Sequence, residues 1–153
     1  MIEWIRIRNL ALIEEAEIEF KEGFNVITGE TGAGKTILTE AIGMLLGERA
    51  DKGVIRTDTS SCEISMSVTV AGPVKKPVCE LLENSGLPHT ENGRICIRRT
   101  ISQSSSRNFV NDTPAALQTL KSLGSMLIDT HGPHEHQSLL KQSVQLELVD
   151  RYG

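Results

Sequence analysis

The sequence predicts an α/β fold built around one glycine-rich loop, and three observations support this prediction. Residues 29–36 fit the pattern G-x-x-x-x-G-K-[ST], which is the Walker A phosphate-binding loop. The apolar and β-branched run at residues 24–28 predicts a buried strand before the loop. Apolar residues then recur at helical spacing along residues 35–46. Strand, loop and helix together are the context that this motif requires, so we expect a nucleotide-binding site here.

Each residue type in the loop has a chemical purpose. The three glycines allow backbone N–H groups to approach phosphate oxygens closely. Lys35 is expected to contact the β- and γ-phosphates and is the first catalytic candidate, while the hydroxyl of Thr36 is expected to ligate Mg²⁺. The expected cofactors are therefore ATP and Mg²⁺. The expected nucleotide contacts are Gly29, Glu30, Thr31, Gly32, Ala33, Gly34, Lys35 and Thr36.

Two segments before the loop alternate with a period of two residues. Isoleucine alternates with arginine over residues 5–8, and glutamate alternates with apolar residues over 15–20. This alternation predicts two half-exposed strands, and the short connection between them favours an antiparallel pair. The acidic row is expected to be a solvated face rather than a metal site.

The rest of the chain reads as further short elements. Gly47 suits the end of the loop helix, and strands are expected at 62–70, 94–101 and 107–111, with a helix at 74–85. Asp112 or Thr113 is expected to cap a helix that has Pro114 at its first position and ends at Gly124. Residues 126–129 predict a second buried strand, and a helical pattern begins at residue 138.

Composition excludes several classes of protein. The chain has 153 residues, enough for one domain with a core, and a net charge of −4, which argues against an intrinsically basic nucleic-acid binder. Cys62, Cys79 and Cys96 form no C-x-x-C pair, so we expect reduced, partly buried thiols. Residues 1–6 show no apolar signal core and no apolar run is long enough to span a bilayer, so a cytoplasmic location is expected.

Four stretches carry a resemblance to a known family. They are residues 7–13 (IRNLALI), 25–36 (NVITGETGAGKT), 107–111 (RNFVN) and 128–140 (IDTHGPHEHQSLL). The chain resembles the N-terminal part of the RecN family of bacterial DNA-repair ATPases, which belong with the SMC-like, ABC-type ATPases. The last stretch is the most specific of the four, and the resemblance covers nearly the whole chain.

The resemblance implies the N-terminal lobe of an ABC-type ATPase head over residues 1–137. Its fold would be a mixed sheet around the Walker A helix with an adjoining antiparallel β-subdomain. Residues 138–153 would begin a helix leading toward a coiled coil, and the signature motif and Walker B would lie in a C-terminal lobe. A second copy of the head would supply the signature motif to this nucleotide. The full-length protein would bind DNA in the nucleoid and repair double-strand breaks, and this chain alone would hydrolyse little ATP.

The resemblance also marks individual residues. Pro133 stands where the family usually has a glutamine that touches Mg²⁺ and the attacking water. Gln137 matches another family glutamine and is the second catalytic candidate. Arg56 stands where related heads carry an arginine that stabilises phosphate charge across the dimer, with a plain surface arginine as the alternative.

Three other interpretations remain open. A self-contained small P-loop NTPase or kinase could use Asp129 as its Walker B aspartate, although Thr130 stands where an ABC-type enzyme places its catalytic glutamate. A metal site could use a cluster of imidazoles and carboxylates, although ligands so close in sequence need a special turn to converge. Its members are Asp129, His131, His134, Glu135 and His136. The lobe could also act as an interaction module that docks a partner.

Overall fold

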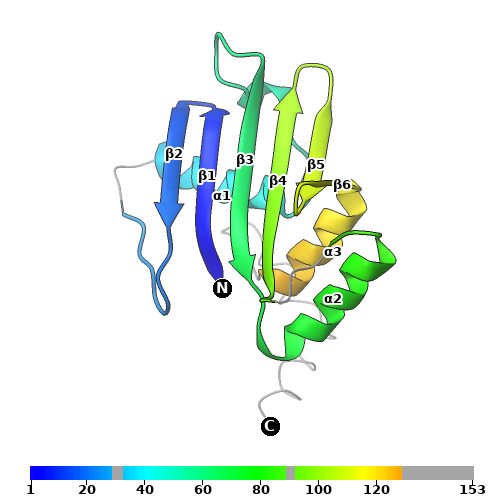
Figure 1. Ribbon diagram of the computed structural model, residues 1–153. Coiled ribbons are helices and arrows are strands. Elements are labelled where there is room, and N and C mark those ends of the chain that lie inside the picture. Colours follow the sequence, from blue (N-terminus) through cyan, green and yellow to red (C-terminus); the bar gives the residue numbers. More distant parts are fainter. Residues whose placement is uncertain (29–32, 89–91, 129–153) are drawn as a thin grey trace, which may run out of the picture.

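The computed structural model describes residues 1–28, 33–88 and 92–128, and a six-stranded sheet forms its centre (Figure 1). The strand order is β2-β1-β3-β4-β5-β6, and every neighbouring pair is antiparallel. The strands are β1 Ile2–Leu10, β2 Ile13–Glu19, β3 Ser61–Thr69, β4 Arg94–Ser102, β5 Ser106–Val110 and β6 Thr113–Ala115. The helices are α1 Ala33–Leu45, α2 Lys75–Asn84 and α3 Leu117–Leu127, with short 3₁₀ turns η1 Lys52–Val54 and η2 Gly72–Val74.

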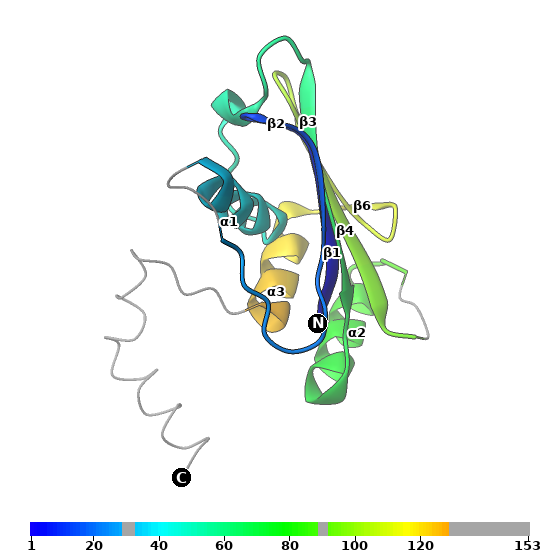
Figure 2. The ribbon, with the colours of Figure 1, turned by 90° about the vertical axis from the view of Figure 1, so that its left-hand side faces the viewer.

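The core lies on one face of this sheet. Successive side chains of a strand point to opposite faces, so the alternating isoleucines of β1 and β4 all reach the same side. Helices α1 and α3 lie on that side, as the edge-on view in Figure 2 shows. Leu45 of α1 and both Leu120 and Leu123 of α3 are fully buried there. The sheet residues buried on this face include Ile5, Ile7, Ile64, Met66, Ile97 and Ile101.

The opposite face of the sheet, which we call the outer face, is charged. Arg8 pairs with Glu15 across β1 and β2 at 2.9 Å, and Arg6 pairs with Glu17 in the same ladder. The acidic row of β2 is therefore a solvated face with cross-strand ion pairs, as expected from its alternation.

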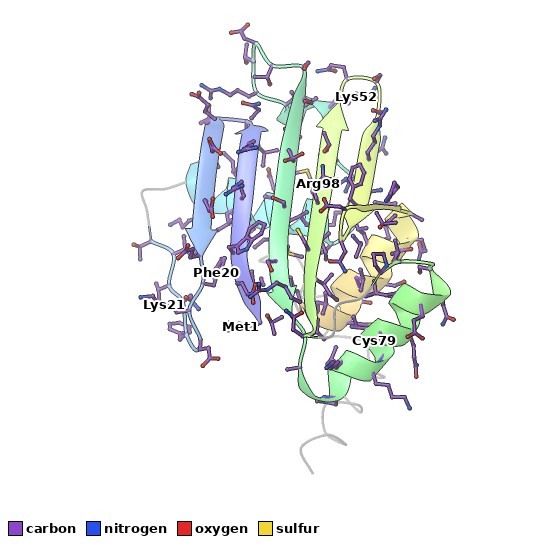
Figure 3. The ribbon with its side chains drawn as sticks, in the orientation of Figure 1. Met1, Phe20, Lys21, Lys52, Cys79 and Arg98 are labelled. Carbon is purple, nitrogen blue, oxygen red and sulfur yellow. The ribbon has the colours of Figure 1, made fainter. Side chains whose placement is uncertain are left out.

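Further along the outer face, Arg98 of β4 lies at the middle of the sheet (Figure 3). Its guanidinium stacks on the ring of Phe109 with 4.3 Å between the guanidinium carbon and the ring centroid. It also pairs with Glu63 at 3.5 Å and with Asp112 at 3.0 Å. The arginine is thus held on three sides by neighbouring strands and turns.

The strands and helices confirm most of the expected elements. The first two strands form the antiparallel pair, α1 occupies the expected loop helix, and α2 buries Val78 and Leu82. The three cysteines are free thiols, with Cys62 buried and the other two half-buried. Among the described residues, no helix combines the length and apolar character needed to cross a membrane.

The expected buried strand at residues 24–28 is wrong for this structure. These residues form no strand, and Phe24 is 93% exposed, Val26 65% and Ile27 45%. The amide of Asn25 donates to the carbonyl oxygens of Lys21 and Gly23, which makes a local turn before the segment. A strand needs a neighbour to satisfy its backbone groups, and no described strand lies alongside this one. The parallel part of the expected mixed sheet is therefore absent from the described residues, whose sheet is antiparallel throughout.

The helix expected to begin near Asp112 starts later. Asn111 and Asp112 have φ of +48° and +60°, the left-handed pair of a two-residue hairpin turn. This turn folds Thr113–Ala115 back onto β5 as strand β6, with Pro114 opposite Phe109. Helix α3 then begins at Leu117, which is 37% exposed.

The end of α3 also differs from the expectation. Gly124 does not end the helix but lies buried within it, where an added Cβ would be 2.9 Å from the Cβ of Leu46. Met126 and Leu127 belong to its last turn, so the expected strand over 126–129 is not formed at its described positions, and Asp129 lies outside the described residues. Close packing against Leu46, just beyond the end of α1, makes glycine the residue that fits here, and its helix-breaking tendency is overridden.

Candidate functional site

The candidate site is the start of α1. Its first turn carries Gly34, Lys35 and Thr36, all exposed, with no acidic residue among them. The N–H groups of a first helical turn have no intrahelical acceptor, and they stand at the positive end of the helix dipole. This end of α1 can therefore bind an anion such as phosphate. The other predicted loop residues, 29–32, lie outside the described residues, and the side chain of Ala33 does too.

The apolar face of α1 holds the helix on the sheet. Ile37, Leu38, Ala41 and Leu45 are buried, as expected from their spacing, while Ile42 and Leu46 are only partly buried. Met44 is also buried, although the sequence pattern did not select it.

The far end of α1 stops at Gly47. Its φ is +90°, and Glu48 donates its backbone N–H to the carbonyl of Gly43 while Gly47 donates to Met44. This is the Schellman arrangement, which uses a left-handed glycine to satisfy the last helical carbonyls. An added Cβ on Gly47 would approach the backbone nitrogen of Lys121 in α3 at 2.9 Å, so glycine also lets the two helices meet.

Arg99 of β4 donates hydrogen bonds to the C-terminal end of α1. It is 3% exposed, and its Nη1 donates to the carbonyl oxygens of Met44 at 2.7 Å and Glu48 at 2.6 Å. Its Nε donates to the hydroxyl of Ser106 in β5 at 3.0 Å. Burial lowers the pKa of Arg99. A cation at the negative end of a helix dipole is stabilising, so this buried charge fixes α1 to β4 and β5.

The predicted motifs do not include Arg99. The signal was nevertheless present in the strand alternation: Ile95, Ile97 and Ile101 face the core, and Arg99 occupies the same register. A charged residue at an inward position of a strand is expected to have specific partners. The helix carbonyls that serve as those partners cannot be identified from sequence, because they come from a different part of the chain.

Arg56 makes hydrogen bonds to the end of β1 and to the β1–β2 turn. Its Nη1 donates to the carbonyl of Leu12 at 2.9 Å, and its backbone N–H donates to Asn9 at 2.9 Å. In this structure the arginine joins the segment after η1 to the β1–β2 turn. A role on phosphate across a head dimer stays a prediction.

The remaining predicted site residues lie beyond residue 128 and outside the described residues. They include Gln137, Pro133 and the whole candidate metal cluster. The structure therefore does not test where these residues lie relative to α1. Within residues 1–28, 33–88 and 92–128, no group of three or more histidine, cysteine or acidic side chains could hold a metal ion.

Comparison with known proteins agrees with the resemblance in sequence. The AAA domain family matches residues 5–150. Over its full length the chain is 36% identical to the DNA repair protein RecN of Vibrio cholerae, and it is 33% identical to RecN of Bacillus subtilis. It spans about a quarter of those relatives, 27% and 26% of their lengths.

Solved structures show the same fold at low identity. A chain from a study of ATP-driven dimerisation and DNA-stimulated activation of SMC ATPases matches with a TM-score of 0.67 at 18% identity, covering 99% of each chain. The Smc head domain of Pyrococcus furiosus matches with a TM-score of 0.66 at 19% identity, over 92% of this chain and 38% of that one. RecF bound to ATP matches with a TM-score of 0.56 at 18% identity, over 75% and 27%. The expected fold class, an ABC-type head lobe, is confirmed.

The buried position of Arg99 yields a prediction about stability. Replacing Arg99 by Met should lower the free energy of unfolding by about 2–4 kcal/mol, because the carbonyl of Met44 in α1, the carbonyl of Glu48 just beyond it and the hydroxyl of Ser106 lose their donor. Urea unfolding followed by circular dichroism measures this change.

The neighbouring residue is the matched control. Arg98→Met removes the same charge from the outer face, where the guanidinium is partly solvated, and should cost about 1 kcal/mol or less. Equal losses for the two variants would contradict the assignment of Arg99 as the residue that holds α1.

Proposed function

The chain belongs to the AAA domain family, and we propose that it is the ATP-binding N-terminal lobe of a RecN-like DNA-repair ATPase. The observation that carries this proposal is the exposed first turn of α1, where the end of a Walker A motif opens a helix whose other end is fixed by Arg99. Similarity to RecN along the whole chain supports the link to DNA repair.

The residues at the start of α1 suit phosphate chemistry. Lys35 would place its ammonium on the β- and γ-phosphates, and the N–H groups of the first turn would bind phosphate oxygens. The Thr36 hydroxyl would ligate the Mg²⁺ that accompanies ATP. Gly29, Glu30, Thr31, Gly32 and Ala33 would complete the loop through their backbones, with Gln137 as a second catalytic group near the attacking water.

Hydrolysis would need groups from outside this chain. The SMC relative comes from a study of ATP-driven dimerisation, and we propose the same arrangement here, with ATP held between two heads. The second copy would contribute a signature motif, and the full-length protein would be the ATPase that couples head dimerisation to DNA binding. The 153-residue chain alone would bind ATP weakly and hydrolyse little.

The exposed segment at residues 24–28 supports a head that is divided between this chain and a C-terminal lobe. It combines an aromatic and β-branched residues that favour strands, yet Phe24 is 93% exposed. We propose that this segment becomes a strand when the C-terminal lobe of the same protein lies against it.

The runner-up function, a self-contained small P-loop NTPase or kinase, has lost part of its support. It relied on a strand at 126–129 ending in Asp129, and Met126 and Leu127 are helical instead. No described residue favours it over the split head.

The Walker A lysine gives the most direct test of ATP binding. Lys35→Ala in the full-length protein should weaken ATP binding by at least tenfold, because the triphosphate loses its principal cationic contact. Titration calorimetry with Mg·ATP measures the affinity, and Lys121→Ala, an exposed lysine on α3, is the matched control. Unchanged affinity in Lys35→Ala would rule out α1 as the nucleotide site.

Substitution of Phe24 tests whether the C-terminal lobe covers residues 24–28. In the isolated chain, Phe24→Ser should change the free energy of unfolding by about 0.5 kcal/mol or less, since the ring is exposed. In the full-length protein the same change should cost about 2 kcal/mol or more, because the ring would be buried by the other lobe. Thermal unfolding of both proteins provides the comparison. A small effect in both would show that the other lobe does not cover this segment.

A further inference from the structure

An open hollow of about 510 Å³ lies at one end of the sheet. It is formed where β3 begins and where the hairpin joins β4 to β5, and Figure 1 shows these two features together at the end of the sheet opposite the N-terminus. Its lining residues are Ser60, Ser61, Thr100, Ser102, Gln103, Ser104, Ser105 and Arg107. We call this feature the hairpin hollow.

The chemistry of the hairpin hollow is that of hydrogen-bond donors. Its lining carries hydroxyl groups, one amide and one guanidinium, and it includes no carboxylate. Hydroxyl and amide donors around a guanidinium are the groups that proteins use on phosphate oxygens.

Arg107 differs from the other arginines of the outer face. Arg6, Arg8, Arg94 and Arg98 are each paired with a carboxylate. Arg107 stands opposite Thr100 in the register of β4 and β5, and no carboxylate in the described part of the chain pairs with it. Its charge is therefore available to an anion in the hollow, whereas the charges of the other four are largely neutralised.

The hairpin is built to hold its shape. The Ser102 backbone N–H donates to Ser105 at 2.8 Å, and the Ser105 N–H donates to the Ser102 hydroxyl at 3.1 Å. At its base, Ser106 accepts a hydrogen bond from the buried Arg99. The donors that line the hollow thus project from a fixed turn, which reduces the ordering cost of binding.

We propose that the hairpin hollow binds the sugar–phosphate backbone of DNA, with one phosphate on Arg107 and hydroxyl donors around it. This inference rests on the proposed function, which requires a DNA-binding surface on the full-length protein. A hollow of this size accepts a sugar–phosphate unit with its neighbours entering from solvent. Contacts of this kind are independent of base sequence and depend on salt.

The test measures DNA binding by the full-length protein at several salt concentrations. The probes are two fluorescein-labelled DNA duplexes of unrelated sequence, and binding is followed by fluorescence anisotropy. Arg107→Gln should weaken binding to both duplexes by about three- to tenfold and reduce the slope of log Kd against log salt by about one, as expected for one lost phosphate contact. The double variant Ser104→Ala with Ser105→Ala should weaken binding less, with the slope unchanged.

Lys76→Gln is the matched control. It removes one positive charge from an exposed side chain on α2, at the other end of the sheet from the hairpin hollow, and should change affinity by less than about twofold (Figure 1). An Arg107→Gln protein with wild-type affinity and slope would overturn the proposal. An Arg107→Gln protein that binds DNA as the wild type does, but whose DNA binding is inhibited less by inorganic phosphate, would also overturn the proposal. The hollow would then take a free anion.

The same preparation separates this inference from the proposed function. If the wild-type protein binds Mg·ATP and DNA while Arg107→Gln behaves as Lys76→Gln does, only the hairpin hollow is wrong. If the wild-type protein binds no Mg·ATP or no DNA, the proposed function fails and this inference fails with it.

Discussion

The buried guanidinium of Arg99 is the contact on which the site depends. It donates to two carbonyls at the end of α1 and to Ser106 in β5, so one side chain joins the helix, the central strand β4 and the β4–β5 hairpin. Because these partners are carbonyls and a hydroxyl, the charge is compensated by the negative end of a helix dipole instead of by a carboxylate. The opposite, positive end of the same helix is left exposed, which is where phosphate chemistry can take place.

The two faces of the sheet differ in chemistry and in role. The inner face supplies the apolar surface on which α1 and α3 pack, and small residues such as Gly124 let the helices meet closely. The outer face is covered by cross-strand ion pairs in which the positive and negative charges nearly cancel. This face therefore attracts a polyanion only weakly. Among the outer-face arginines that the structure describes, Arg107 at the hairpin lacks a carboxylate partner and stands among hydroxyl groups. The hairpin and α1 share Arg99 as a neighbour, so the proposed DNA and ATP sites rest on one packed unit.

Much of the fold could be predicted from periodicity, because alternation in β1, β3 and β4 and helical spacing in α1 are imposed by local burial. The failures have a common cause. Residues 24–28 have the composition of a buried strand, but a strand needs a partner, and none lies beside them in the described residues. Asp112 reads as a helix cap and Asn111 as the last residue of a strand, yet both adopt left-handed angles and turn the chain into β6. The role of Arg99 was hidden because its partners come from distant positions in the sequence.

Amide hydrogen exchange in the full-length protein tests the central claim, that α1 binds phosphate at its exposed end while its other end stays fixed. Addition of Mg·ATP should slow exchange at the backbone N–H groups of Gly34, Lys35 and Thr36, because these amides would donate to phosphate oxygens. Exchange near Met44 and Leu45 should change little, since that end is already held by Arg99. Unchanged exchange at the first turn of α1, with ATP bound elsewhere on the protein, would contradict the account.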